Sequence, residues 1–426
     1  MTGLLDCNNF FVSCERVFNP RLRNRPVAVL SNNDGCIVAL SNEAKALGLK
    51  RGQPYFKVRQ LCDSKGVTVL SGNHRLYGDL SNRVMTTIAA VAADIHVYSV
   101  DECFVSFTSG KADECVAQSR EIVRRVRRHV GIPTSVGIAP TKTLAKTAAR
   151  FAKNFPAYRC VCAIDNEYRR RRALELTPLS DIWGIGRRLS ARLADYGMKM
   201  AIDLADKPLA EVDRILNITG IRTWRELNGQ ACISNDIACD HDDVPQKQMC
   251  ASRSFRDMIT DLEGMNEAVS LFATIISRRM REHSLAARGV SVFIQTNTRR
   301  DDLPQYCNSA HIPLAEPAND TLSIATCARE ALHAIFRKGF AYKRAGIFIT
   351  ELCSAAAIQQ SLFTDPAERL RRNRLMKAVD SLNASSATHD RVHIASYMPV
   401  ESIARCEMRS PDFSTRMSDI ITVNTF

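Results

Sequence analysis

The chain has 426 residues, of which 45% are hydrophobic and 24% charged, a composition typical of a globular protein with roughly three domains. Its 58 basic residues against 45 acidic residues leave a net charge of +13, which favours a polyanionic partner such as nucleic acid. No run of about 18 apolar residues exists and the start, MTGLLDCNNF, lacks the pattern of a signal peptide, so we expect a cytoplasmic protein without a membrane span.

The first part of the chain is predicted to be mixed α/β. Strands at 26–31 and 36–41 flank the sequence NNDG, a strong β-hairpin signal, and a short helix that Gly48 would end follows them. The remaining predicted elements here are helices at 81–95, 112–130 and 141–155, a strand pair at 96–107 and a strand at 133–140.

The rest of the chain is predicted to form two further parts. Residues 166–235 are helical and basic, and DDVPQKQ (242–248) has the composition of a linker. A second, smaller α/β unit follows, and from residue 353 the tail is polar and basic without a clear core. The predicted elements of the second unit are strands at SRSF, 289–296 and 343–352, and helices at 265–283 and 319–338.

The 15 cysteines are scattered and lack the paired C-x-x-C spacing of zinc sites. In a cytoplasmic protein, such cysteines are usually reduced and fill the core. We therefore expect neither a disulfide framework nor a cysteine metal site.

The segment YSVDECF (98–104) places two adjacent acids, Asp101 and Glu102, inside a strand-forming run. Neighbours on an unbroken strand point to opposite faces, so one acid would face the core, where an unpaired charge is costly. A bend that joins two antiparallel strands here would let both carboxylates project to one side. Such a pair at a strand corner is usually only surface decoration.

A third acid changes this interpretation. Asp6 lies in the predicted N-terminal strand GLLDCNNFFVSCE, between Leu4, Leu5 and Phe10. Three carboxylates on adjacent strands raise one another's pKa unless cations neutralise them. Mg²⁺ prefers oxygen ligands, and two such ions can clamp the attacking and leaving oxygens of a phosphoryl transfer. The sequence therefore predicts a two-Mg²⁺ site formed by Asp6, Asp101 and Glu102.

A basic helix face is predicted at 141–155. On a helical wheel, Lys142, Lys146, Arg150 and Lys153 fall within about 80° of one another, opposite an apolar side. For a typical helix, the ordinary interpretation of such a face is that solvent covers it.

The glycine-rich turn WGIGRR (183–188) is a candidate phosphate-binding segment. The chain has no Walker-type phosphate loop, and this turn lacks the third glycine of a dinucleotide-binding motif. It resembles a helix-hairpin-helix, with Gly184 and Gly186 between two short helices, where backbone N–H groups can hold a DNA phosphate. A tight turn between helices without a ligand is the alternative.

Several motifs, taken in order, resemble those of the Y-family translesion DNA polymerases: LLDCNNFFVSCE, VLSNNDGCIVALSNEAKALG, YSVDECF, GIAPTKTLAK and IWGIGRR. Within the family, SNNDGC, SNRVM and SRSF resemble the UmuC type, and the resemblance covers essentially the whole chain. It implies an α/β multidomain right-hand polymerase with a helix-hairpin-helix thumb and an α/β little finger. The implied domains are a palm (1–19 and 79–165), fingers (20–78), a thumb (166–241), a linker (242–248), a little finger (249–352) and a tail (353–426).

The resemblance also assigns roles in the palm. Asp6, Asp101 and Glu102 match the catalytic, metal-binding carboxylates, and Cys7 would lend its backbone carbonyl to a metal. Phe11 matches the steric gate that excludes a ribonucleotide, although UmuC-type proteins more often have Tyr there. An aromatic residue packed in the core is the alternative for this position.

Further residues are implied to bind nucleotide, DNA or the sliding clamp. The implied nucleotide-binding residues are Phe10, Phe11, Ala39, Lys45 and Lys153. Lys45 stands where other members carry Arg, so bidentate phosphate contact is lost, and small Ala39 leaves room for a damaged base. The implied DNA contacts are Gly184, Gly186, Arg187 and Arg253. In the peptide QQSLF, the implied clamp anchors are Gln359, Leu362 and Phe363.

The resemblance implies an error-prone, template-directed DNA polymerase that carries out translesion synthesis in the SOS response. It would use two Mg²⁺ ions, a dNTP and primer–template DNA, and would need a sliding clamp, a cleaved UmuD dimer and RecA for full activity. One alternative is a non-catalytic scaffold that binds DNA and competes for the clamp. Another is a different two-metal enzyme such as a nucleotide cyclase, against which the hairpin turn and the second α/β unit argue.

Overall fold

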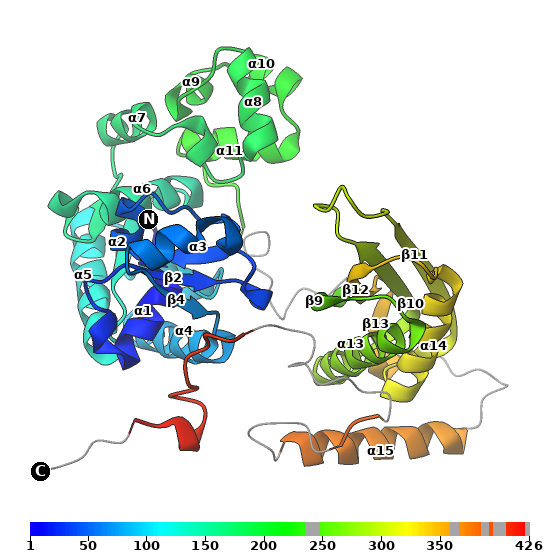
Figure 1. The fold of residues 1–426 in the computed structure, drawn as a ribbon. Coiled ribbons are helices and arrows are strands. Elements are labelled where there is room, and N and C mark those ends of the chain that lie inside the picture. The colour runs from blue at the N-terminus through cyan, green and yellow to red at the C-terminus, as the bar shows by residue number, and fades with distance from the viewer. Residues whose placement is uncertain (235–247, 358–365, 385–391, 395–405, 422–426) are drawn as a thin grey trace, which may run out of the picture. The chain divides into compact units, whose positions relative to one another are not determined.

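The computed structural model describes residues 1–234, 248–357, 366–384, 392–394 and 406–421 (Figure 1). The chain divides into two compact units. The first unit comprises Met1–Val29, Cys36–Val244 and Ser410–Phe426, and the second comprises Leu30–Gly35 and Pro245–Arg409. Each has its own hydrophobic core.

The first unit is built on a five-stranded sheet in the order β5-β6-β1-β7-β8. Central β1 is antiparallel to β6 and β7, whereas β7 and β8 are parallel. Because side chains alternate along a strand, Leu4 and Leu5 of β1 enter cores on opposite faces of the sheet. The strands are β1 (Thr2–Cys7), β5 (Asp94–Val97), β6 (Glu102–Ser106), β7 (Thr134–Ala139) and β8 (Val161–Ala163).

Helices cover both faces of this sheet. One face packs against α1 (Phe10–Phe18), α4 (His74–Ala89) and α5 (Ala112–His129), and the other against α6 (Lys142–Asn154). Helix α6 can approach β7 closely because Gly137 has no side chain. A Cβ there would lie 2.0 Å from the amide nitrogen of Ala149 and 2.2 Å from the carbonyl oxygen of Ala145. The glycine therefore fixes how near α6 lies to the sheet.

A smaller sheet in the order β3-β2-β4 also belongs to the fold. The strands predicted at 26–31 and 36–41 are confirmed, and Gly48 has the left-handed φ of +86° expected of a residue that ends a helix. The elements here are β2 (Val27–Leu30), β3 (Ile37–Leu40), α2 (Asn42–Ala46), α3 (Tyr55–Ser64) and β4 (Thr68–Ser71).

The helical character predicted after residue 165 is confirmed. Several of these helices share a core with α6, and both α7 and α11 contact α6. They are α7 (Glu167–Glu175), α8 (Arg187–Asp195), α9 (Ala201–Ala205), α10 (Leu209–Ile215) and α11 (Ile218–Leu227).

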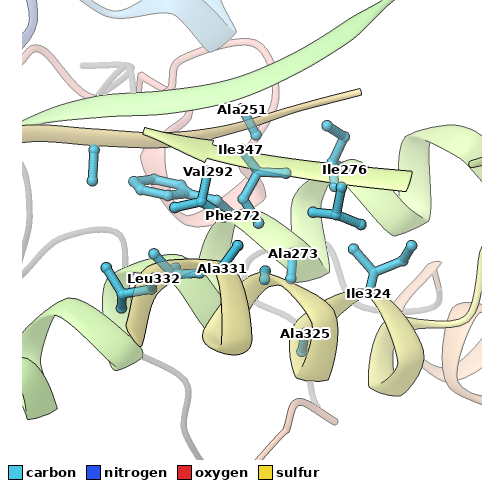
Figure 2. Packing of buried hydrophobic residues seen from close by; sticks show 14 of the residues in the cluster. Ala251, Phe272, Ala273, Ile276, Val292, Ile324, Ala325, Ala331, Leu332 and Ile347 are labelled. Atoms are coloured by element: carbon cyan, nitrogen blue, oxygen red, sulfur yellow. The ribbon is translucent and has the colours of Figure 1, made fainter. Parts of the chain in front are cut away.

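The second unit contains a sheet in the order β11-β10-β12-β9, with β13 paired to β10. Figure 2 shows its core, where Ala251, Val292 and Ile347 of the strands meet side chains of α13 and α14 such as Phe272 and Leu332. The elements are β9 (Met249–Ile259), α13 (Leu262–Glu282), β10 (Leu285–Thr296), β11 (Cys307–Ala318), α14 (Thr321–Ile335), β12 (Tyr342–Ile349) and β13 (Leu352–Ser354).

Several elements differ from the sequence predictions. The predicted N-terminal strand ends at Cys7, because Phe10–Phe18 form helix α1. Helix α4 begins at His74 rather than at Ser81, because the Asn73 side chain caps it by accepting from the amide of Leu76 at 3.3 Å. Strand β11 was not predicted. The tail, expected to lack a core, contains α15 (Pro366–Ala384), which is attached to α13 by the ion pair of Arg281 with Asp380 at 2.6 Å.

Other expectations concern the cysteines, a membrane span and the linker. Buried Cys7, Cys14 and Cys103 fill the core as expected. Over the ranges that the structure describes, no helix is long and apolar enough to cross a membrane. All but the last residue of the predicted linker at 242–248 lies outside the described residues, and the domain boundaries stay predictions.

Candidate active site

The three predicted carboxylates lie on adjacent strands. Asp6 near the end of β1 is paired in register with Glu102, the first residue of β6. The amide of Cys7 donates to the carbonyl oxygen of Asp101 at 2.9 Å. The amide of Ser99 donates to the carbonyl oxygen of Glu102 at 3.0 Å. The chain therefore bends just before β6, as the sequence predicted, and brings the three acids to one end of the strand pair.

Ser99 stabilises this bend. Its hydroxyl donates to Asp101 Oδ1 at 2.6 Å and accepts from the amides of Asp101 and Glu102 at 3.2 and 3.1 Å. One small side chain thus orients a carboxylate and satisfies two amides of the turn. We did not identify Ser99 from the sequence, although a Ser two residues before an acid at a bend is a recognisable turn signal.

Two lysines of α6 contact the acids. Lys153 Nζ lies 2.7 Å from Asp6 Oδ1, and Lys146 Nζ lies 2.8 Å from Glu102 Oε2. The interpretation of the α6 basic face as merely solvent-covered is therefore wrong. It failed because a helical wheel shows which side chains share a face and cannot show what another strand places opposite them.

The other two basic residues of this face are also engaged. Lys142 is buried and donates to the carbonyl oxygen of Ser234 at 2.9 Å, and Arg150 pairs with Asp181 at 2.5 Å. The whole face of α6 is thus bound to acidic or carbonyl oxygens of the first unit.

The electrostatics of the acids follow from their partial burial. Burial raises the pKa of Asp6 and the charge of Asp101 adds to this, whereas Lys153 lowers it. Burial also raises the pKa of Glu102, with Lys146 acting in the opposite direction. Each acid is therefore held where its negative charge is unfavourable unless cations are near.

The acidic residues fit a hard divalent cation in their chemistry. Their donors are carboxylate oxygens, which Mg²⁺ prefers. Among the described residues, no group of three or more His, Cys, Asp or Glu side chains already converges as a metal-binding cluster. Lys146 and Lys153 supply the positive charge that this carboxylate site needs when no metal ion is bound.

Positive charge also gathers beside Asp6. Lys45 of α2 donates from Nζ to Asn9 Oδ1 at 2.7 Å. Burial lowers the pKa of Lys45, and the charges of Lys153 and Arg51 lower it further. Lys153 and Arg51 are therefore each close enough to repel Lys45, an arrangement that suits a bound polyphosphate. Sequence reasoning had not singled out Arg51 or Asn9.

The two adjacent phenylalanines of α1 have different environments. Phe10 is 4% exposed and belongs to the core, whereas Phe11 is half-buried and stacks on Tyr77 with ring centroids 4.3 Å apart. Ala39 of β3 is half-buried beside the same core. Of the two rings, Phe11 has more surface left for a ligand.

The glycine-rich turn precedes α8. Gly184 has a φ of +90°, and a Cβ there would lie 2.8 Å from Thr223 Oγ1, so a larger residue is excluded. Gly186 caps α8, whose first residue, Arg187, is exposed. The element before the turn is a short 3-10 helix at Leu179–Asp181.

The tryptophan of this turn contacts Tyr98 and Lys146. Trp183 Nε1 donates to the hydroxyl of Tyr98 at 3.1 Å. Lys146 Nζ lies 4.9 Å from the centre of the Tyr98 ring and 5.8 Å from that of Trp183, a cation–π arrangement. The lysine that pairs with Glu102 is therefore held by two aromatic rings, which the sequence did not reveal.

The remaining predicted residues belong to other parts of the sequence. Arg253 is exposed on β9 of the second unit, where it donates to the carbonyl oxygen of Ser252 at 2.9 Å. The predicted clamp anchors Gln359, Leu362 and Phe363 lie outside the described residues.

Comparison with known families gives two matches. Residues 5–150 match the model of the impB/mucB/samB family, and residues 246–362 match that of the C-terminal domain of the same family. The first range contains all three carboxylates and Lys146, and Lys153 lies three residues beyond its end.

Known relatives match nearly the whole chain. Protein UmuC of Salmonella typhimurium is 38% identical over 99% of this chain and 100% of its own length. DNA polymerase IV of Caulobacter vibrioides is 25% identical over 89% of each chain.

Solved structures agree on the fold. A Y-family DNA polymerase chimera, Dbh-Dpo4(243-245)-Dbh, matches with a TM-score of 0.61 and 20% identity, covering 82% of this chain and 98% of its own. The right-hand polymerase fold expected from the sequence is thereby confirmed. The chain belongs to the impB/mucB/samB family, that is, to the UmuC type of the Y-family translesion DNA polymerases.

Proposed function

We propose that the chain is an error-prone, template-directed DNA polymerase that extends primers across damaged bases in the SOS response. The observation that supports this most is the register of β1 and β6, which places Asp6 opposite Glu102 and next to Asp101. Partly buried acids on adjacent strands, two of them paired with lysines, are costly to maintain without a function that uses them.

The carboxylates of Asp6, Asp101 and Glu102, with the backbone carbonyl of Cys7, would hold two Mg²⁺ ions. When bound, such ions would supply Lewis-acid chemistry to the primer 3′-hydroxyl and to the α-phosphate. In the reaction, the hydroxyl oxygen would form a bond to the α-phosphorus and lose its proton to solvent, while the bond from phosphorus to the bridging oxygen would break and pyrophosphate would leave. Ser99 keeps Asp101 oriented throughout.

The cations and the half-buried ring of Phe11 would bind the nucleotide. Lys45, Lys153 and Arg51 would bind the triphosphate of a dNTP, because phosphate charge relieves the repulsion of Lys45 by the other two. Phe11 would lie against the sugar and exclude a 2′-hydroxyl, and Ala39 would leave space beside the nascent base pair.

DNA and protein partners complete the proposal. The backbone amides after Gly184 and Gly186, together with Arg187, would hold a phosphate of the primer–template, and Arg253 would contribute from the second unit. Gln359, Leu362 and Phe363 would dock on the sliding clamp. A cleaved UmuD dimer and RecA would be needed for full activity. The scaffold alternative receives no observation in its favour.

Primer extension tests this function directly. Purified wild-type chain is compared with an Asp101→Ala, Glu102→Ala double variant on undamaged and abasic templates, with Mg²⁺ and all four dNTPs. The matched control is Asp113→Ala, Glu114→Ala, which removes an adjacent acid pair that is exposed at the start of α5. We expect extension by the wild type and the control and none by the active-site variant.

If the wild type alone is inactive, the reaction is repeated with the clamp, the cleaved UmuD dimer and a RecA filament. Inactivity there as well, or equal extension by the active-site variant, would contradict the polymerase proposal.

A further inference from the structure

A C-terminal segment, Ser410–Phe413, docks on the first unit. The Asn73 side chain donates from Nδ2 to the carbonyl oxygens of Ser410 and Pro411 at 3.1 and 3.3 Å. The ring of Phe413 stacks on Phe18 of α1, with centroids 5.1 Å apart and planes 11° from parallel. The segment is thus held by both polar and apolar contacts.

A charged residue of the segment is also covered. Asp412 is 8% exposed, and its carboxylate lies 4.0 Å from Arg75 at the start of α4. Burial of this acid shows that the segment is packed against the unit and does not merely cross its surface.

The segment reaches a buried acid. Glu15 of α1 is 1% exposed, and its Oε1 accepts from the Tyr77 hydroxyl at 2.7 Å and from the Ser410 hydroxyl at 3.0 Å. A buried carboxylate needs such donors because it has lost water. Ser410 therefore supplies, from the far end of the sequence, part of what keeps Glu15 and Tyr77 in place.

Tyr77 in turn supports Phe11. Their rings are nearly parallel, 16° apart, and the Tyr77 ring is 1% exposed whereas Phe11 is half-buried. The hydroxyl fixes one end of the Tyr77 ring, and the Tyr77 face limits how far Phe11 can recede. Three successive contacts thus link Ser410 to Phe11 through Glu15 and Tyr77.

We propose that Ser410, Glu15 and Tyr77 are positioning residues that hold Phe11 against the sugar of the incoming nucleotide, so that the docked C-terminal segment increases selection of dNTP over rNTP. This rests on the proposed function and on the role of Phe11 in it. The physical reason is that a 2′-hydroxyl adds a single oxygen, so a ring free to recede slightly would admit it. Selectivity of that kind depends on a rigid support behind the contacting group.

The test measures single-nucleotide incorporation by the full-length chain. The ratio of kcat/KM for dATP to that for ATP is determined opposite a template T for wild type, Ser410→Ala and Tyr77→Phe. The matched controls are Ser418→Ala, an exposed hydroxyl of the same C-terminal region, and Tyr168→Phe, an exposed tyrosine of α7.

We expect the ratio to fall about three- to tenfold in both test variants, the range that one hydrogen bond supports, and to stay unchanged in the controls. A smaller fraction of folded enzyme lowers both rates equally, so a merely structural role leaves the ratio unchanged. Ser410→Ala alters a half-buried hydroxyl and gives a result even if Tyr77→Phe folds poorly.

A double variant tests the route of the effect. In a Phe11→Ala background, which should itself lower the ratio, adding Ser410→Ala should change nothing further, because Ser410 acts through the Phe11 ring. A further fall in the double variant would overturn the inference.

The remaining outcomes separate this inference from the proposed function. If Phe11→Ala lowers the ratio while Ser410→Ala and Tyr77→Phe do not, the positioning inference is wrong and the polymerase proposal stands. If Phe11→Ala leaves the ratio unchanged, the sugar-contacting role of Phe11 and this inference are both wrong. Absence of any incorporation, even with the protein partners, would overturn the polymerase proposal and this inference with it.

Discussion

Asp6 and Glu121 are both acids paired with cations, yet their environments move their pKa values in opposite directions. Burial dominates for Asp6 and raises its pKa above the ordinary 3.8, despite Lys153. Glu121 on the surface of α5 accepts hydrogen bonds from Arg124 and Arg125, which lower its pKa from 4.5 to about 2. At the residue scale, the balance of desolvation and pairing therefore decides whether an acid opposes or supports folding.

This contrast predicts stability slopes of opposite sign in the metal-free protein. Because the folded state holds the Asp6 proton more tightly than the unfolded state, wild type should lose stability relative to Asp6→Asn as pH rises from about 3.8 through the raised folded pKa. For Glu121 the folded pKa is depressed, so wild type should gain stability relative to Glu121→Gln as pH rises from about 2 to 4.5. Urea unfolding in EDTA, at pH values from about 3 to about 7, measures the pH dependence of stability for wild type and both variants. Two slopes of the same sign would contradict the assignment.

Residues near the site show how far sequence reasoning reached. The bend at Asp101 and Glu102 could be predicted from neighbouring residues alone. Two adjacent acids do not fit an unbroken apolar strand, and a bend at that position lets both carboxylates project to one side. Lys146 and Lys153 were seen as one face but not as partners of the acids, since that contact depends on the packing of α6 on the sheet. The support of Phe11 by Tyr77 likewise depends on the relative placement of α1 and α4.

At the scale of elements, the packing of α6 on β7 positions the lysines that contact the acids of the site. Residues of α6 reach both Asp6 and Glu102, so the distance of this helix from the sheet sets the ion pairs. Gly137 permits that distance, because its missing Cβ would overlap backbone atoms rather than flexible side-chain ends. Predicted helices and strands with strong periodicity were confirmed, whereas β11, with its half-exposed polar pattern, was missed.

Gly137→Ala should therefore destabilise the chain by about 3 kcal/mol and reduce primer extension, because the backbone of α6 must move away from β7. The control is Gly78→Ala in α4, where a Cβ would meet nothing within 4 Å. That change should stabilise by about 0.5–1 kcal/mol through helix propensity. Chemical denaturation measures the change in the free energy of unfolding for each variant. A Gly137→Ala protein as stable as wild type would contradict the role given to the contact between α6 and β7.

The start of α8 gives a second prediction for an element. Arg187→Ala should weaken binding to primer–template DNA and reduce the slope of log affinity against log salt by about 0.9, the value for one lost phosphate contact. Arg120→Ala on α5, also an exposed arginine, is the control and should change neither quantity. Fluorescence anisotropy over a salt series supplies both values. An unchanged slope for Arg187→Ala would remove this residue from the DNA-binding surface.

At the scale of the whole molecule, the chain separates into two units with independent cores. The order of domains could be expected from the resemblance of ordered motifs, because those motifs run along the sequence. The return of Ser410–Phe426 to the first unit could not, since nothing local in a polar tail shows which distant surface it will cover. The packing of this segment on the first unit depends on side chains that come into contact only when the chain has folded.

Clamp binding is predicted to be separable from catalysis. Replacing Gln359, Leu362 and Phe363 together by Ala should reduce affinity for a purified sliding clamp at least about tenfold, because the two apolar anchors would carry most of the contact energy. Extension without the clamp should be unchanged. Ser361→Ala within the same peptide is the control. Surface plasmon resonance with immobilised clamp measures this, and undiminished binding would show that the contact lies elsewhere.

The contact between Ser410 and Glu15 joins positions 395 residues apart in sequence. Glu15 and its helix leave the ribosome long before Ser410 is made. Until Ser410 has emerged, Glu15 of the nascent chain lacks one of its hydrogen-bond donors. Completion of the α1–α4 surface therefore requires that synthesis has passed Ser410, and products that end before this residue would lack its hydrogen bond to Glu15.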